Sequence, residues 1–166
     1  MGGSGFFSRF FGGSPKVDIG RHYERLAESF SGTMSTFYKA RDKATGAVVG
    51  LKIIDPRKSA PIESRYKGLG KPSEGEIGGK IAGPNIVRTL KSGVTTDGSP
   101  FVVQEFVEGT LLHALLSSRK PLSPARRLDL VRQAATALAA VHKAGFVHRD
   151  RKSTRLNSSH QIISYA

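Results

Sequence analysis

The sequence predicts an α+β fold, in which an antiparallel sheet of about five strands and one packed helix precede further helices. Two observations lead to this prediction. Between residues 23 and 107, short runs rich in Val, Ile, Phe and Tyr alternate with turn residues, which is typical of strands. From residue 122 to 145, apolar residues recur at helical spacing. With 166 residues, the chain is long enough for one domain with a hydrophobic core.

The composition limits the classes of partner and compartment. The chain has 26 Lys and Arg against 13 Asp and Glu, a net charge of +13. This charge suits nucleic acid or an acidic membrane surface, but the basic residues are scattered and no nucleic-acid-binding motif occurs, so a solvated basic surface is favoured. The absence of cysteine excludes disulfides and thiolate zinc sites. No apolar run has the length of a membrane span and the N-terminus lacks a signal-peptide pattern, so we expect a cytoplasmic protein.

Residues 1–19 are rich in Gly and Ser and are expected to form a flexible tail. Four phenylalanines in it would share one side of a helix, which would suit a membrane surface or a groove on a partner. Because this segment is short and flanked by glycines, a mobile tail is the preferred interpretation. The four residues are Phe6, Phe7, Phe10 and Phe11.

Three strands are expected next, over residues 23–30, 33–41 and 47–54. The turn residues at 42–46 join the second strand to the third, so the simplest arrangement is an antiparallel meander. The tip of the first hairpin contains Gly32 and other small residues. Such a tip lets the backbone approach a ligand closely and offers N–H groups to a phosphate.

A helix is expected from Ser73 to about Ala82, after a loop over residues 55–70 in which one helical turn can form. Ser73 and Glu76 have the spacing of a capping box, and a Gly-Pro pair ends the helix. Three glycines inside this helix weaken it by ~1 kcal/mol each relative to alanine. We interpret this weakness as suited to an element that moves during regulation.

The second half of the chain begins with a hairpin over residues 86–94 and 100–107, followed by a short helix over 111–118. A longer helix begins with Ser123 as N-cap and Pro124 at its first position. Its apolar residues follow helical spacing and are expected to form a buried stripe. The stripe consists of Leu128, Val131, Ala135, Leu138 and Val141.

Four motifs resemble those of protein kinases and occur in the order of that family. They are Phe30 to Ala40, similar to the glycine-rich loop; Val49 to Lys52, similar to V-A-I-K; Gly83 to Val87, similar to H-P-N-I-V; and His148 to Asp150, which reads H-R-D after the helix that Gly145 ends. The chain therefore resembles a eukaryotic-like (Hanks-type) serine/threonine protein kinase domain, truncated at the catalytic loop. The resemblance implies a kinase N-lobe over 20–108, the start of a C-lobe over 109–150 and a non-native-looking tail over 151–166.

This resemblance implies roles in ATP binding for several residues. Lys52 would hold the α- and β-phosphates, and Glu74 would pair with Lys52. Glu74 is favoured over Glu76, whose side chain serves the capping box. Without the resemblance, Lys52 would be a strand lysine that reaches water. The backbone groups of Glu105 and Val107 would face the adenine edge, after Gln104 as gatekeeper.

The glycine-rich loop is degenerate in this chain. Only its middle glycine, Gly32, is kept, whereas Phe30 and Ser35 stand in place of the first and third. Weaker nucleotide binding follows from side chains at positions of close backbone approach, although Ser35 is small enough to be tolerated. In the H-R-D motif, Asp150 would orient the substrate hydroxyl and accept its proton.

The implied reaction is transfer of the ATP γ-phosphoryl group to Ser or Thr hydroxyls of a protein substrate, with Mg²⁺ as cofactor. The family's Mg²⁺ ligands are absent from this chain, since Arg155 stands at the Asn position and no D-F-G follows. We therefore expect a chain that binds ATP at best and does not turn over. A pseudokinase or scaffold module is the alternative, and a basic protein that binds nucleic acid or acidic lipid ranks third.

The end of the chain has a different character. Residues 150–160 are similar to the translation of a common sequencing-library adapter. On that interpretation residues 151–166 are not encoded by the gene, and Asp150 agrees with H-R-D partly by chance. We also expect the last helix to expose an apolar face that the remainder of a C-lobe would cover.

Overall fold

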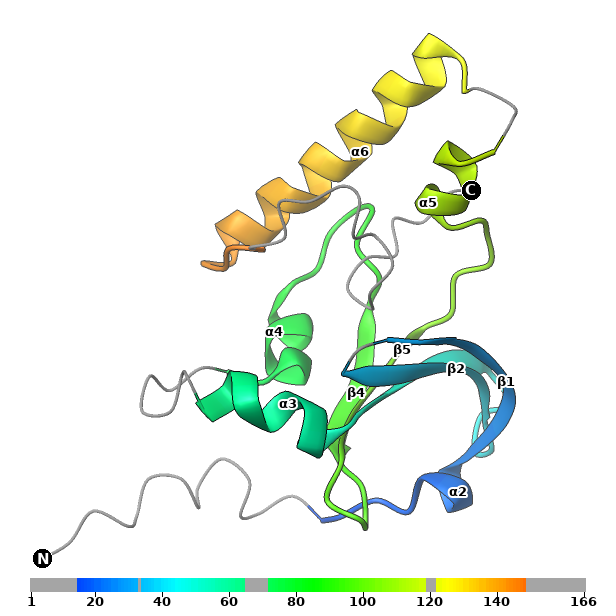
Figure 1. Ribbon diagram of the computed structural model, residues 1–166, viewed down its shortest axis with the longest axis vertical. Coiled ribbons are helices and arrows are strands. Elements are labelled where there is room, and N and C mark those ends of the chain that lie inside the picture. The colour runs from blue at the N-terminus through cyan, green and yellow to red at the C-terminus, as the bar shows by residue number, and fades with distance from the viewer. Residues whose placement is uncertain (1–14, 33, 65–71, 119–121, 149–166) are drawn as a thin grey trace, which may run out of the picture.

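The computed structural model describes residues 15–32, 34–64, 72–118 and 122–148. It confirms the predicted α+β fold, with an antiparallel sheet of five strands in the order β1-β2-β3-β5-β4 (Figure 1). Helix α4 lies along this sheet, and helices α5 and α6 follow it. The strands are β1 (Tyr23–Ser31), β2 (Ser35–Asp42), β3 (Val48–Ile54), β4 (Thr89–Val94) and β5 (Pro100–Glu105).

Strand register gives the sheet two different faces. Side chains alternate along a strand, so neighbours in sequence point to opposite faces. One face carries Leu51 of β3 opposite Val103 of β5. The other face carries Lys52, which pairs with Phe37 of β2 and Val102 of β5. The lysine is thus placed on the face against which α4 packs.

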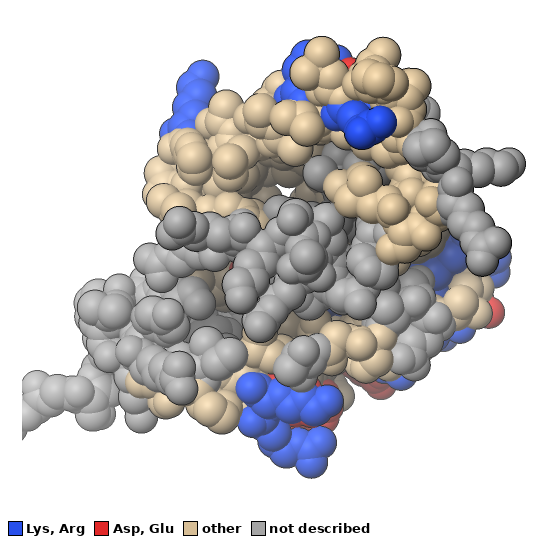
Figure 2. All heavy atoms as spheres, turned by 45° about the horizontal axis from the view of Figure 1, so that its top comes forward, with Lys and Arg blue, Asp and Glu red and all other residues tan. Residues whose placement is uncertain are grey.

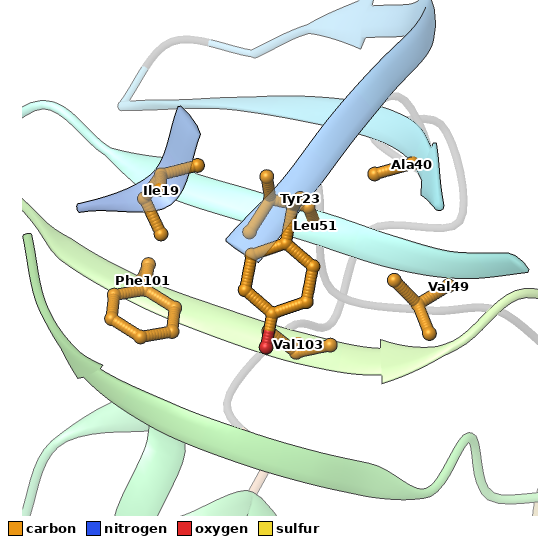
Figure 3. Close-up of a cluster of buried hydrophobic side chains, with 7 residues drawn as sticks. All are labelled: Ile19, Tyr23, Ala40, Val49, Leu51, Phe101 and Val103. Atoms are coloured by element: carbon orange, nitrogen blue, oxygen red, sulfur yellow. The ribbon is translucent and has the colours of Figure 1, made fainter. Parts of the chain in front are cut away.

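The hydrophobic core lies on the Leu51 face (Figure 3). Leu51 and Phe101 are almost completely buried there. Burial of such side chains is the main favourable contribution to folding, at about 1.5–3 kcal/mol for each. The cluster consists of Ile19, Tyr23, Ala40, Val49, Leu51, Phe101 and Val103.

The fold begins earlier than the sequence suggested. Val17 forms a parallel bridge with Thr95, in which the Val17 N–H donates to the Val94 carbonyl at 2.9 Å. Helix α2 (Ile19–His22) follows and buries Ile19 in the core. Residues 15–19, expected in the flexible tail, therefore belong to the folded domain. Two isolated apolar residues without periodicity gave no signal of this contact. The Phe6 to Phe11 cluster lies outside the described residues.

Helix α3 (Pro56–Glu63) replaces the loop expected after β3, and that expectation was wrong for these residues. The Asp55 carboxylate accepts the N–H of Arg57 at 2.9 Å, and Pro56 occupies the first helical position. Proline is tolerated there because its missing N–H has no helical partner. Pro61 inside the helix is the residue that made a loop the natural expectation.

Helix α4 (Glu74–Lys80) has the predicted start. Ser73 is its N-cap, and the reciprocal hydrogen bonds of the capping box with Glu76 are both present. The helix ends at Lys80, two residues before the expected end, and packs on β4. The predicted hairpin of β4 and β5 is confirmed, with β4 beginning at Thr89.

Helix α6 (Pro124–Lys143) follows the short helix α5 (Leu112–Leu116). Ser123 caps α6 as expected, and Gly145 after it adopts a φ of +82°. The N–H groups of Gly145 and Phe146 donate to the carbonyls of His142 and Val141, which is a Schellman motif.

The predicted burial of the α6 stripe is wrong in this structure. Leu128 is 71% exposed, Val131 66% and Leu138 40%, whereas the buried residue of α6 is Leu130. Figure 1 shows why, since α6 lies apart from the sheet. The exposure agrees with the second expectation, that this face lacks its cover. None of the helices in the described ranges combines the length and apolarity needed to cross a bilayer.

Candidate functional site

The candidate site is built around a buried lysine. Lys52 lies in the middle of β3, with 2% of its surface exposed. Its neighbours along the strand, Leu51 and Ile53, point to the core face, so strand alternation directs the ammonium to the opposite face. Buried lysines are rare and need a partner of opposite charge.

Glu74 provides that charge. The Lys52 Nζ donates to the Glu74 Oε1 at 2.6 Å, and the glutamate side chain remains 35% exposed. Burial lowers the pKa of Lys52 below its ordinary value, and the charge and hydrogen bond of Glu74 act in the opposite direction. The pair therefore has one desolvated end and one end open to water.

The rival carboxylate, Glu76, is engaged elsewhere. It accepts the Ser73 backbone N–H at 2.7 Å and the Ser73 hydroxyl at 2.8 Å. These hydrogen bonds hold the pKa of Glu76 below its ordinary value. The structure thus brings together the two residues that the sequence paired, and gives Glu76 the capping role.

The tip of the β1–β2 hairpin lies at one end of this face. The Gly32 N–H donates to the Ser35 carbonyl at 2.8 Å, so this N–H is used within the hairpin. Ser35 is buried, with 6% of its surface exposed. The carbonyl of Met34 accepts the Asp55 N–H, which ties the tip to the end of β3. Thr33 and the side chain of Phe30 lie outside the described part.

Sequence reasoning missed a buried aromatic ring beside Lys52. Phe37 is 3% exposed, and its ring lies over Gly50. A Cβ atom at Gly50 would lie 2.5 Å from the Phe37 Cζ and 3.2 Å from the Gln104 Cγ. The Phe37 ring also stacks on Phe106, with centroids 6.5 Å apart. The register of the β2–β3 hairpin could have revealed this contact, because it pairs Phe37 with Lys52.

The segment after β5 is fastened to β2. Lys39 forms an ion pair with Glu108 and lies over the Phe106 ring, 4.7 Å from its centroid. The aromatic and charged contacts together hold residues 106–108 against the Lys52 face of the sheet. This face is therefore bounded on one side by α4 and on the other by the segment after β5.

The two residues expected at the adenine edge lie in this region. The Glu105 N–H donates to the Arg88 carbonyl at 3.0 Å, so this N–H is used within the protein. The Glu105 carboxylate accepts the Arg88 N–H at 2.9 Å. Val107 is half-buried, and its N–H has no hydrogen-bond partner within the part of the chain that the structure describes.

Asp150 lies outside the described residues, as does the whole of 149–166. Neither its proposed contact with a hydroxyl nor the adapter interpretation is tested, and both remain predictions. Sequencing genomic DNA across codon 149 decides whether the tail is encoded. Across residues 15–32, 34–64, 72–118 and 122–148, no group of three His, Asp or Glu side chains could hold a metal ion.

The arrangement has a clear chemical capacity. A desolvated ammonium, fixed by a carboxylate, can bind an anionic phosphate oxygen as a localised charge. Backbone groups at the end of β5 lie on the same face, beside the buried Phe37 ring. Such a face fits a ligand that has phosphates at one end and groups that hydrogen-bond to the backbone at the other.

Comparison with known proteins identifies relatives. The family model described as "Protein kinase domain" matches residues 23–156. Serine/threonine-protein kinase PknD of Mycobacterium tuberculosis is 37% identical over 130 residues, which are 78% of this chain and 19% of PknD. Serine/threonine-protein kinase pkn3 of Myxococcus xanthus is 32% identical over 127 residues, 73% of this chain and 22% of that protein. The chain thus spans about a fifth of the length of these relatives.

Solved structures of kinases are also similar to this chain. The crystal structure of Rad53 1-466 in complex with AMP-PNP superposes with a TM-score of 0.67 and 27% identity, over 84% of this chain and 35% of that one. The PknI kinase domain of M. tuberculosis gives a TM-score of 0.62 with 23% identity, over 78% of this chain and 51% of that one. At this lower sequence identity, the likeness to PknI shows a shared fold alone.

Proposed function

This chain belongs to the protein kinase domain family, and from that premise we propose that its protein transfers the γ-phosphoryl group of ATP to Ser or Thr hydroxyls of a protein substrate. The observation that carries the proposal is the ion pair of buried Lys52 with Glu74, on the face of the sheet against which α4 packs. A buried ammonium whose pKa is lowered by burial marks a candidate site for an anionic ligand, and its carboxylate partner would hold it in position. The names of the relatives, and the AMP-PNP bound to Rad53, support the same reaction.

In this proposal, the described residues bind and orient ATP. Lys52 holds the α- and β-phosphates, and Glu74 keeps the ammonium in position. Gly32 and Ser35 form the cover over the phosphates by their small size. The Glu105 carbonyl and the Val107 N–H meet the adenine edge, and the Phe37 ring lies on the same face. Stable positioning is the main contribution of a protein to phosphoryl transfer.

The reaction joins the substrate hydroxyl oxygen to the γ-phosphorus and breaks the bond between that phosphorus and the β,γ-bridging oxygen. Asp150 would accept the hydroxyl proton, and ADP would leave. Mg²⁺ is the ion that screens phosphate charge in this chemistry. The described residues do not supply ligands for it, and Arg155 stands where the family has an Asn, so no step is assigned to the ion.

Nucleotide affinity tests the proposal. We expect the 166-residue chain to bind AMP-PNP in isothermal titration calorimetry, and Lys52→Met to weaken binding by tenfold or more, about 1.4 kcal/mol. Lys43→Met is a matched control, because Lys43 Nζ donates to the Gly20 carbonyl, far from the Lys52 face in the β2–β3 turn region. Equal affinity of the Lys52→Met variant and the parent chain would contradict the proposal.

A pseudokinase or scaffold is the second candidate. It is favoured by Phe30 and Ser35 in place of glycines, and by the Phe37 ring on the site face. Binding of AMP-PNP without Lys52-dependent phosphorylation of a generic substrate by the whole gene product would select it. The third candidate is a nucleic-acid or lipid binder. On the face drawn in Figure 2, Lys and Arg side chains stand in separate groups, which gives this candidate little support.

A further inference from the structure

Helix α4 contains three glycines among seven residues, at 75, 78 and 79. Each costs about 1 kcal/mol of helix stability relative to alanine, so their presence needs a reason. Gly78 and Gly79 lie three and four residues after Gly75, so helical spacing alone does not separate the three positions. Helix α4 lies along β4 (Figure 1), and contact with this strand distinguishes the three glycines.

Gly75 and Gly78 are in close contact with β4. A Cβ atom at Gly75 would lie 2.2 Å from the Ser92 Cβ and 2.5 Å from its Oγ. A Cβ atom at Gly78 would lie 2.3 Å from the Thr89 Oγ1. A Cβ atom at Gly79, by contrast, would meet nothing within 4 Å. The helix therefore lies at a depth that only glycine permits at two of the three positions.

These contacts are coupled to the ion pair through the chain itself. Gly75 directly follows Glu74, whose carboxylate is 2.6 Å from the Lys52 ammonium. The Ser92 Cβ is attached to the backbone and cannot rotate away, so relief of the overlap requires the helix to move. Since real Cβ contacts below 3.0 Å are essentially absent, the movement is at least about 0.8 Å, the difference from 2.2 Å. A displacement of that size exceeds the tolerance of a short charged hydrogen bond.

We propose that Gly75, assisted by Gly78, is a positioning residue that sets the depth of α4 on β4 and thereby holds Glu74 at Lys52. Gly75 has the larger effect, because Thr89 can rotate its hydroxyl away from a new side chain at position 78. The glycines then serve close packing, in place of the mobility that helix propensity alone suggests. The relevance to catalysis rests on the proposed function, whereas the effect on the ion pair does not.

The test measures the accessibility of the Lys52 amine directly. The 166-residue chain and its variants are acetylated with limiting acetic anhydride at neutral pH, and the modified fraction of each lysine is read by mass spectrometry. Lys43 is the internal reference. The variants are Gly75→Ala, Gly78→Ala and Gly79→Ala, with Ser92→Gly alone and combined with Gly75→Ala. Ser92 is exposed, so its truncation leaves no cavity.

We expect Lys52 to be modified several-fold faster in Gly75→Ala, less so in Gly78→Ala, and unchanged in Gly79→Ala. Adding Ser92→Gly to Gly75→Ala should restore protection, because the atom that the new methyl group meets has been removed. Circular dichroism of each variant separates a local change from unfolding, in which all lysines gain reactivity together. A Gly75→Ala chain that stays folded with Lys52 as protected as before overturns the proposal, and so does failure of Ser92→Gly to restore protection.

Nucleotide binding separates this proposal from the proposed function. If the parent chain binds no AMP-PNP while Lys52 still loses protection in Gly75→Ala, the proposed function fails and the positioning role stands. If the parent chain binds AMP-PNP and Gly75→Ala leaves both affinity and Lys52 protection unchanged, the positioning role fails alone.

Discussion

The two members of the Lys52–Glu74 pair are expected to differ sharply in what their removal costs. Replacing Glu74 by Gln leaves an ammonium in a site where 3% of its side chain is exposed. Replacing Lys52 by Met leaves a carboxylate that is 35% exposed and can keep part of its hydration. Both substitutions remove the same ion pair. The difference between the two losses of stability therefore reports how deeply the lysine is buried.

The structure sets the magnitude. Removing one partner of a buried ion pair costs about 3–5 kcal/mol. A lysine can escape part of this cost by losing its proton. With an ordinary pKa of 10.5, neutralisation at pH 7.5 costs about 4 kcal/mol, since each pH unit corresponds to about 1.4 kcal/mol. We therefore expect Glu74→Gln to destabilise the chain by about 2–4 kcal/mol at pH 7.5, and Lys52→Met by under about 1.5 kcal/mol.

The sign of the pH dependence follows from proton binding. In Glu74→Gln, burial holds the pKa of Lys52 further below 10.5, because the raising effect of Glu74 is gone. The unfolded chain then binds more protons than the folded chain, so stability rises with pH up to 10.5. At pH 9.5 the cost of Glu74→Gln should fall to about 1.4 kcal/mol, which is the free energy needed to neutralise a lysine one pH unit below its ordinary pKa.

Urea unfolding followed by circular dichroism measures these free energies. Glu108→Gln is the matched control, because it makes the same chemical change in the ion pair of Glu108 with Lys39. The Glu108 side chain is 77% exposed. This exposed pair should contribute under about 1 kcal/mol and show no comparable pH dependence. Equal costs for Glu74→Gln and Lys52→Met, or a Glu74→Gln cost that does not fall between pH 7.5 and 9.5, would refute the reasoning.

Three further outcomes are expected. Gly50→Ala should destabilise the chain by about 1–3 kcal/mol in thermal unfolding, because its methyl group overlaps the Phe37 ring. Phe37→Leu in the same chain should recover part of this lost stability. An unchanged stability of Gly50→Ala would show that the ring moves freely. Gly145→Ala should cost about 1 kcal/mol although the space around it is open, because φ is +82° there, and an unchanged melting temperature would contradict this. Ser73→Ala should cost about 1 kcal/mol of stability and raise the pKa of Glu76 in an NMR titration. In the parent chain, the stability that Glu76 contributes is present above pH 4.5 and is lost as the pH falls through its lowered pKa. A Glu76 pKa that is unchanged in Ser73→Ala would argue against the capping box.

The strands and the capped helices were predictable because their signals are local. Alternating apolar residues and the turn at 42–46 define the first hairpins, and Ser73 with Glu76 defines the start of α4. Lys52 and Glu74 could be paired in advance because the motifs around them follow the order of a known family. Even so, the reason that the pair is strong, the burial of one member and the exposure of the other, required the structure.

The missed features depend on contacts between distant segments. Gly50 is an ordinary strand residue until the Phe37 ring is placed over it from the neighbouring strand. Gly75 weakens a helix by its propensity, and only its distance to Ser92 gives it a packing role. The α6 stripe follows helical spacing correctly, but periodicity states which residues share a face and does not state that the face is covered.

The bridge between Val17 and Thr95 has a consequence for the order of folding. The hairpins of β1 with β2, β2 with β3 and β4 with β5 each join segments close in sequence, whereas this bridge closes a loop of almost half the chain. Loop-closure entropy delays such long-range contacts until the local ones exist. We therefore expect the contact of Val17 with Thr95 to form after the local hairpins, and its loss to uncover Ile19 of the core.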